Sequence, residues 1–446
     1  MRFVRLADAE QGSHRNATAR MRFAQASSLA LRCNIARKLT GLGYREFSVR
    51  CAESSLLQWF LRINKVDNIK TPAKSTLERF DKWVSAQAMT EFNQTIFAAA
   101  CGDQTREDAL NLSTPLDDSE IWFDSTCLKV NIHFPVDWLL LRDATRTLMK
   151  ATALIRRSGL KHRRPNEPED FLRRMNNLAM EMSAASRQAD SKSARKKILR
   201  SMKTLQHKIT AHARAHRDLL ANAGDETTLS AKKAAVVVAR IDAVLAQLPA
   251  AIKQAHERII GERTVPNAKK TLSLYEPDVA ILVRGKAGAR VEFGQKLWLG
   301  ETREGLIADY RLEKDAPSDT TLVPPAIERV LAAGVKLKRV WGDRGLFCKA
   351  NERALEKLGI KSGLCPRDPK VLRARLESDP ALGAGLPRRG ATEARIAIFK
   401  NCFAGSPCLA KGFAHREQAV GWAVLAHNLW VLARRENAAA RKQQAA

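Results

Sequence analysis

"IWFDSTCLKVNIHFP" occupies residues 121–135, and this stretch decides how we expect the rest of the chain to fold. Its run of apolar residues predicts a buried β-strand, yet Asp124 lies in the middle of that run. A buried carboxylate is costly unless a cation or hydrogen-bond donors compensate it. The position of Asp124 therefore points to a specific role for this side chain.

The charge of the chain indicates a polyanionic partner. Its 446 residues include 76 Lys and Arg against 47 Asp and Glu, which gives a net charge of +29 and a pI near 10.2. This charge favours nucleic acid, because each phosphate that a cation neutralises releases a counterion and adds affinity. A basic solvated surface, a ribosome-binding protein and a protein that binds anionic lipid are the alternatives.

Three features bear on the cellular compartment. The sequence contains no run of 18 apolar residues, so no membrane span is predicted. Its first residues, MRFVRLADAE, lack the apolar segment of a signal peptide. The eight cysteines form no CxxC pair, which argues against a zinc site or a disulfide framework. We therefore expect a cytoplasmic, nucleoid-associated protein without a membrane partner.

Hydrophobic periodicity divides the chain into segments, and its length predicts two or three domains of roughly 150 residues each. The triplet MRF occurs at 1–3 and again at 21–23, so Met21 is a second candidate start. The expected organisation is a disordered extension at 1–24, a helical DNA-binding domain at 25–112, the first part of an α/β core at 113–160, a helical insertion at 161–270, the remainder of the core at 271–436 and a basic tail at 437–446.

Two helices near the N-terminus resemble a helix-turn-helix. They are predicted at 51–63 and 75–87, and the polar stretch NKVDNIKTPAK separates them. An ordinary helical bundle with a solvated basic face is the alternative. The residues that we expect to contact DNA lie at the start of the later helix and along it: Lys74, Ser75, Thr76, Arg79 and Lys82.

The insertion is predicted to be an antiparallel helical hairpin or a small bundle. Apolar residues recur at alternating steps of four and three, as in helices that pack along one stripe. The stripes are Ile198, Met202, Leu205, Ile209 and His212 in one helix, and Val237, Ile241, Val244 and Leu248 in the next. The turn between them is ANAGDETT at 221–228. The basic outer face could clamp DNA or could merely be solvated.

The C-terminal part returns to alternating strands and helices. Residues 291–299 and 305–312 predict a β-hairpin, a strand at 335–341 ends at GDRG, and a short strand follows at 359–364. A loop rich in Pro, Gly and Arg is predicted at 366–390, followed by helices at 391–400 and 416–435. This pattern predicts an α/β fold with a mixed sheet.

Three acids lie where such a fold can bring distant residues together. Asp124 lies within a strand, Asp343 ends another, and Glu393 begins a helix. Converging carboxylates suit Mg²⁺, or Mn²⁺, and two ions about 3.5–4 Å apart can support phosphodiester displacement. Each acid also has a simpler explanation. An Asp in a strand is often an edge residue or an ion-pair partner, GDRG is often a turn, and a Glu favours the start of a helix dipole.

Three blocks of sequence in this order resemble the DDE transposases of bacterial insertion sequences. FDSTCLKVNIHFPVDWLLLRDA is similar to their first acidic block, VWGDRGLFCKANERALEKLGI to the second and EARIAIFKNCF to the third. One group carries the signature Y-(2)-R-(3)-E-(6)-K, in the style of ISNCY-type elements. Arg389, Glu393 and Lys400 match its last three positions, while Leu386 replaces the tyrosine. VLAHNLWVLAR at 424–434 is similar to the closing helix, and the resemblance spans most of 25–435.

The resemblance implies a ribonuclease-H-like core in which Asp124, Asp343 and Glu393 bind two Mg²⁺ ions. The helical insertion would then interrupt this core between its first and second strands. Lys400 and Arg389 would hold the DNA backbone near the metals, and Arg344 is a further candidate. Glu417 is a rival third acid that lacks the Arg and Lys partners, and we expect His133 to be structural.

We therefore expect a transposase that binds terminal inverted repeats, cleaves the DNA and joins the freed 3′-hydroxyls to target DNA. Two transposon ends must be brought together, so a homodimer or larger assembly is expected. The alternatives are a metal-dependent nuclease of the same fold without strand transfer, and a non-catalytic or repurposed DNA-binding protein derived from a transposase.

Overall fold

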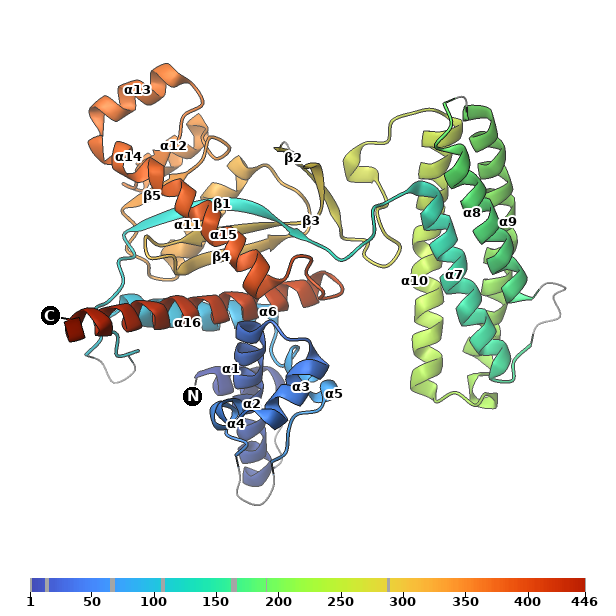
Figure 1. Cartoon of the computed structure of the whole chain (residues 1–446), viewed down its shortest axis with the longest axis horizontal. Helices are drawn as coiled ribbons and strands as arrows, with labels where there is room; N and C mark the ends of the chain where they lie inside the picture. The colour runs from blue at the N-terminus through green and yellow to red at the C-terminus, as the bar shows by residue number, and fades with distance from the viewer. Residues whose placement is uncertain are drawn as a thin grey trace. The chain divides into compact units, whose positions relative to one another are not determined.

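The computed structural model describes residues 2–12, 16–64, 69–105, 109–161, 167–189, 191–286 and 289–445 (Figure 1). The chain forms two compact units. Residues 1–131 and 282–446 make up one, here called the sheet unit, and residues 132–281 make up the other, here called the helical unit. The chain thus leaves the sheet unit after its first strand and returns to it near the second.

A six-stranded mixed sheet organises the sheet unit, in the order β2-β3-β1-β5-β6, with β4 also paired to β3. The first strand is antiparallel to β3 and parallel to β5, and β5 is parallel to β6. The strands are β1 (Glu120–Lys129), β2 (Ala280–Lys286), β3 (Ala289–Glu301), β4 (Ile307–Glu313), β5 (Arg339–Gly342) and β6 (Lys361–Leu364). The predicted mixed α/β sheet is confirmed, as is the antiparallel hairpin of β3 and β4.

Helices cover both faces of this sheet because successive strand residues point to opposite sides. On one face Phe123 and Trp298 pack with α11 and α12; on the other, Leu128 and Leu299 pack with the segment after α15 and with α16. The helices of this C-terminal part are α11 (Asp319–Ala332), α12 (Lys349–Lys357), α13 (Pro369–Ser378), α14 (Pro380–Gly385), α15 (Arg389–Ile398), a π-helical turn (Phe399–Ala404) and α16 (Phe413–Ala445).

The N-terminal helices pack against α16, and here the structure corrects the expected disordered extension at 1–24. Phe3 is buried and lies 5.4 Å from Phe92 and 5.6 Å from Trp422, measured between ring centroids. Hydrophobic burial therefore orders the first helix. The helices are α1 (Arg2–Gln11), α2 (Ala17–Thr40), α3 (Tyr44–Glu53), α4 (Ser55–Leu61), α5 (Lys74–Phe80) and α6 (Ala86–Cys101).

The helical unit contains α7 (Asp137–Arg157), α8 (Pro168–Ala185), α9 (Lys192–Asn222) and α10 (Ala231–Ala255), which share one apolar core. The two predicted stripes are confirmed as core: Met202, Ile209, Ile241 and Val244 are buried. The predicted turn is also present, as a short 3₁₀ helix at Gly224–Glu226. The boundary predicted at 160 is corrected to 131, because α7 shares one apolar core with α8, α9 and α10.

Two C-terminal expectations also change. The predicted loop at 366–390 contains α13 and α14, and the predicted basic tail at 437–446 continues α16 to Ala445. Among the described residues, one segment, Ala231–Ile260, is long and apolar enough to cross a membrane by length and composition. Core helices pass the same test, and this segment supplies Ile241 and Val244 to the core of the helical unit.

Candidate active site

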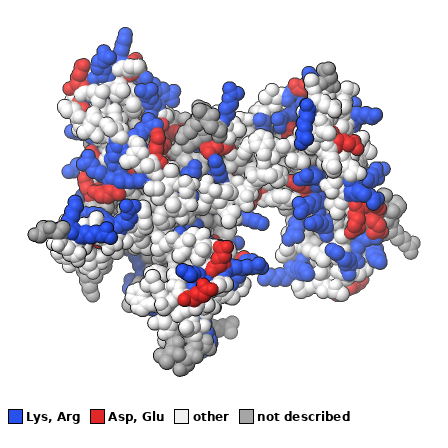
Figure 2. Space-filling model, viewed as in Figure 1, with Lys and Arg blue, Asp and Glu red and all other residues white. Residues whose placement is uncertain are grey.

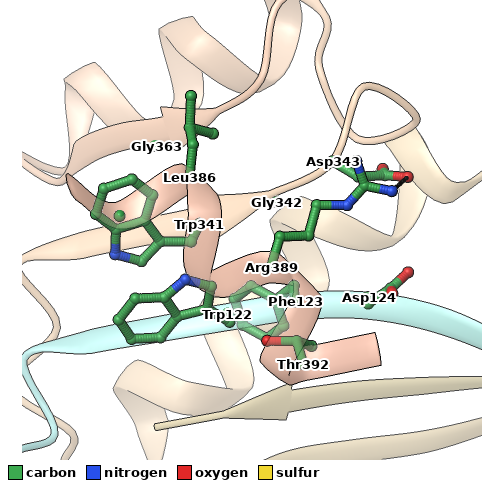
Figure 3. Close-up of a pocket in the computed structure, with 11 residues that line it drawn as sticks. Trp122, Phe123, Asp124, Trp341, Gly342, Asp343, Gly363, Leu386, Arg389 and Thr392 are labelled. Carbon is green, nitrogen blue, oxygen red and sulfur yellow. Dashed lines mark ion pairs between the residues drawn. The ribbon is translucent and has the colours of Figure 1, made fainter. Parts of the chain in front are cut away.

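Strand register places Asp124 and Asp343 at the same level of the sheet. Trp122 on β1 is paired with Trp341 on the parallel strand β5. Each aspartate lies two residues beyond that pair, so both are expected on the same face of neighbouring strands, about 4.8 Å apart in backbone position. Both line one pocket (Figure 3).

Backbone donors fix both carboxylates. The Ser125 N–H donates to Asp124 Oδ1 at 2.7 Å. Asp343 directly follows β5, and its Oδ1 accepts from the N–H groups of Gly345 at 2.7 Å and Leu346 at 3.2 Å. The sequence GDRG thus forms a turn that holds its own aspartate. The Asp343 side chain remains 28% exposed, so it stays open to a ligand.

Helix α15 brings a cation to this pair of acids. Arg389 Nη2 lies 3.8 Å from Asp343 Oδ2 and 3.0 Å from Glu393 Oε1, and in Figure 3 its side chain extends to Asp343. Arg389 therefore links the second predicted acid to the third. Glu393 itself is 54% exposed and does not line the pocket. The three predicted acids thus lie as a pair, Asp124 and Asp343, and a third acid joined to it through Arg389.

Aromatic rings form one wall of the pocket. The indoles of Trp122 and Trp341 stack at 5.5 Å with an angle of 7° between their planes. A Cβ added to Gly385 would lie 1.9 Å from Trp341 Cη2, so this glycine permits the end of α14 to approach the ring. Leu386, at the signature tyrosine position, packs against this cluster and also lines the pocket. The apolar side chain of Leu386 therefore occupies the position at which the signature has the phenol group of a tyrosine.

A buried acid that the sequence analysis missed anchors α15. Glu301 ends β3 and is 5% exposed; Thr392 Oγ1 donates to its Oε1 at 2.8 Å, and Arg388 and Arg395 approach it at 3.4 and 3.5 Å. Burial raises the pKa of Glu301, although these arginines and Thr392 oppose the rise. Arg388 also lies over the Trp122 ring, 4.1 Å from its centroid. Together these contacts fix the helix that carries Arg389 and Glu393.

The remaining predicted phosphate contacts occupy the same face or its edge. Lys400, in the π-helical turn after α15, donates to Thr126 Oγ1 at 3.2 Å. Thr126 is two residues from Asp124 on β1, so both point to one face of the sheet. Arg344 follows Asp343 directly and is exposed. Lys400 thus contacts the strand that carries Asp124, and Arg344 lies in the turn that holds Asp343.

The proposed DNA-reading helix is shorter than predicted. The segment 75–87 divides into α5, which ends at Phe80 with Asp81 as its C-cap, and α6, which begins at Ala86 because the side chain of Ser85 caps it by accepting from the Ala88 N–H. Residues 65–68 of the polar stretch that precedes α5 lie outside the described residues. The candidate DNA contacts gather around α5, all of them exposed except half-buried Thr76: Lys74, Ser75, Thr76, Arg79 and Lys82.

Some of these contacts have local partners. Lys74 forms an ion pair with Glu78 at 3.1 Å, and Arg79 donates to Thr76 Oγ1 at 3.3 Å. Such exposed pairs are weak, at about 0–1 kcal/mol, so phosphates could displace them.

Two other residues considered from the sequence lie outside the pocket. Glu417, on α16, is partly buried and does not line the pocket. Burial raises its pKa, although the charge of Arg311 opposes the rise. His133 Nε2 forms a hydrogen bond with Asp143 Oδ2 at 2.7 Å within the helical unit. This contact fits the structural role expected for His133.

Comparisons of this chain with protein-family models, with curated proteins and with solved structures find no match. Within the described ranges, no three His, Cys, Asp or Glu side chains lie close enough to form a metal-binding cluster. Asp124 and Asp343 nevertheless fit a Mg²⁺ site, because Mg²⁺ commonly uses one or two carboxylates, with water and substrate phosphate oxygens completing its shell.

Proposed function

We propose that this protein is a DDE-type DNA transposase, an enzyme that binds the terminal inverted repeats of an insertion sequence, cleaves DNA there and transfers the strands. The observation that carries the proposal is that Asp124 on β1 and Asp343 directly after the neighbouring parallel strand β5 line one pocket, beneath the helix that carries Arg389 and Glu393. Their order in the chain is also the order of the three acidic blocks.

The topology of the sheet supports a ribonuclease-H-like core. Such a core has an antiparallel hairpin followed by parallel α/β units, and its first strand lies in the middle of the sheet. In this chain β3 and β4 form the hairpin, β1 is central, and β5 and β6 follow it in parallel. The helical unit lies between β1 and β3 in sequence, where the proposal requires an insertion.

Asp124 and Asp343 would hold Mg²⁺, or Mn²⁺, with Glu393 as the third acid of a two-ion site. Bound there, the metal ions would lower the pKa of a water or 3′-hydroxyl and stabilise the leaving oxygen of the phosphodiester. Glu393 must leave its ion pair with Arg389 to take part, a change that costs little because both side chains are about half exposed.

The chain's cations would position the DNA. Arg389, once released from the acids, can bind a phosphate in bidentate fashion, and Lys400 contributes a second charge from the same face. Arg344 would contact the backbone beside Asp343. The exposed residues around α5 would bind transposon ends. We further propose a cytoplasmic, nucleoid-associated protein that acts as a homodimer or larger assembly, because two ends must be joined.

A cleavage and joining assay tests this proposal. DNA from either side of the gene is incubated with the full-length protein and Mg²⁺, and both nicks and joined products are measured. Asp124→Asn, Asp343→Asn and Glu393→Gln should each abolish both products while DNA binding is retained. Glu417→Gln, which changes an acid outside the pocket, is the matched control and should remain active.

The alternative functions give different results in the same assay. Cleavage without joining of pre-cleaved ends would identify a nuclease. If wild-type protein and all three acid variants bind DNA equally and none cleaves it, the protein is a non-catalytic DNA-binding protein and the proposal is wrong.

A further inference from the structure

The seam between α9 and α10 pairs its cations with carboxylates at both ends. At one end Arg217 donates two hydrogen bonds to Asp242, each at 2.9 Å. At the other end Lys192 and Lys196 bind Glu262 at 3.1 and 2.6 Å. Ion pairs near both ends of α9 therefore join it to Asp242 in the middle of α10 and to Glu262 beyond the end of α10.

The middle of the same seam is different. A groove of about 720 Å³ opens there, and Lys203 and Arg214 line it from α9 while Lys253 lines it from α10. In the described part of the chain, none of these three cations forms an ion pair with a carboxylate, and no carboxylate lines the groove. Its other polar lining includes His207 and His256, and Lys203 Nζ lies 3.1 Å from His256 Nδ1.

The rest of the unit has too few acids to neutralise this groove, although the carboxylate of Glu257 interacts electrostatically with Lys253 and His256. Residues 132–281 contain 28 Lys and Arg against 15 Asp and Glu, an excess of 13 positive charges. Helix α9 alone carries nine Lys and Arg and one acid, Asp218. Figure 2 shows Lys and Arg side chains spread over the visible face of this unit. Such a field attracts a polyanion and holds it where cations converge.

We propose that the groove between α9 and α10 binds the sugar-phosphate backbone of double-stranded DNA. Lys203 and Arg214 are eleven residues apart, or about 16 Å along the helix. That length spans about five phosphates of one strand, at about 3.4 Å of axial rise each. A concave line of cations suits a strand better than a flat lipid surface, and the apolar floor of Leu248 and Ile252 leaves the charges at the rims.

Lysine and arginine contacts to phosphates position DNA and carry no sequence information. The groove would therefore bind any duplex equally, unlike the residues around α5, for which we propose recognition of transposon ends. The identity of the polyanion as DNA rests on the proposed function, whereas the cationic groove does not.

The test compares two triple variants of the full-length protein. Lys203→Gln/Arg214→Gln/Lys253→Gln removes the groove cations. Lys197→Gln/Lys233→Gln/Arg240→Gln removes two lysines and one arginine that are exposed on other faces of α9 and α10, and it serves as the matched control. Affinity for a terminal-repeat duplex and for an unrelated duplex is measured by fluorescence anisotropy in EDTA, from 50 to 300 mM KCl.

The groove variant should bind both duplexes at least tenfold more weakly at 100 mM KCl. Its slope of log affinity against log salt should fall by about 2–3, since each lost phosphate contact removes about 0.9. The control should change the slope by less than about 1. A charge-conserving variant, Lys203→Arg/Arg214→Lys/Lys253→Arg, should bind like wild type, which separates lost charge from lost folding.

The inference is overturned if the groove variant and the control lose affinity equally. It is also overturned if the groove variant binds DNA normally but loses binding to phosphatidylglycerol vesicles or to an RNA duplex. Because EDTA prevents cleavage, failure of the proposed enzyme activity leaves this result intact. Conversely, an active transposase whose groove variant binds DNA normally would refute the groove alone.

Discussion

The buried carboxylate of Asp81 holds the N-terminal helices against α16, and replacing it by Asn should destabilise the sheet unit. Asp81 is 3% exposed; it accepts hydrogen bonds from Tyr44 at 2.7 Å and His415 at 3.0 Å, and it pairs with Arg37. Burial alone would raise the pKa of Asp81, but the His415 hydrogen bond and the charges of Arg37 and Lys38 outweigh burial and hold that pKa well below its usual range.

The magnitude follows from what the substitution leaves behind. Asp81→Asn removes the charge partner of Arg37, whose side chain is only 14% exposed. Breaking a buried pair in this way costs about 3–5 kcal/mol of stability. Because Arg37 keeps some exposure to solvent, we expect a loss at the lower end of this range, about 3 kcal/mol. At about 2 cal/mol/K per residue, the unfolding entropy of the sheet unit is about 0.6 kcal/mol/K. Dividing the expected loss of about 3 kcal/mol by this entropy predicts that the thermal midpoint falls by about 5 °C.

Urea titration and scanning calorimetry of the full-length protein measure this loss. Asp315→Asn, which changes an exposed aspartate of the same unit, is the control and should have almost no effect. Adding Arg37→Leu to Asp81→Asn should recover part of the stability, since it removes the unpaired cation. The reasoning is refuted if Asp81→Asn costs no more than the control, or if Arg37→Leu lowers stability further.

Three further predictions concern the sheet around the site. Burial lowers the pKa of His427 to about 4, so the unfolded state binds more protons than the folded state below about pH 6.5. The contribution of His427 to the free energy of unfolding should therefore be complete above that pH and fall by about 3 kcal/mol as the pH drops to 4. His427→Leu should abolish this dependence in urea titrations. Gly385→Ala should cost about 1–3 kcal/mol and slow DNA cleavage, because its Cβ would meet Trp341, whereas Gly383→Ala should do neither, because its Cβ would lie 3.7 Å from Leu376 Cδ2, an ordinary contact. Glu301→Gln should slow cleavage by loosening α15 without weakening DNA binding, and unchanged cleavage would contradict this role.

The sequence predicted those parts of the fold that depend on local pattern. The apolar run around Asp124 forms β1, the alternating residues of 291–299 lie in β3, and the stripes through Ile209 and Ile241 form the helical core. These patterns are local because each helix or strand must bury one face, and the spacing of its apolar residues indicates which face is buried.

Features that depend on distant residues escaped prediction. Phe3 is buried against Trp422, more than 400 positions later in the chain, and this contact orders the first helix. The sequence around Phe3 contains no pattern that predicts the contact. The clamp of Glu301 on α15 joins a strand end to a helix 91 residues later. Its one local signal is an acid that ends an apolar strand, which is the same signal that singled out Asp343.

The pairing of the candidate acids could be predicted only in part. Motif order indicated that Asp124 and Asp343 belong together, and the register of β1 and β5 gives the physical reason. The ion pairs of Arg389 with Asp343 and Glu393 were not foreseen, because the signature spacing cannot say where a flexible arginine points. Arginine at this position was expected to contact phosphate, and it contacts the acids.

We propose that Asp124, Asp343 and Glu393 share a metal site, and metal-directed cleavage of the polypeptide tests this claim. Fe²⁺ bound in place of Mg²⁺ generates hydroxyl radicals that cut the backbone near its ligands when ascorbate and peroxide are added. We predict fragments that end near residues 124, 343 and 393, suppressed both by excess Mg²⁺ and by Asp124→Asn. Cuts confined to other positions, or cuts at these positions that persist unchanged in Asp124→Asn, would contradict the claim.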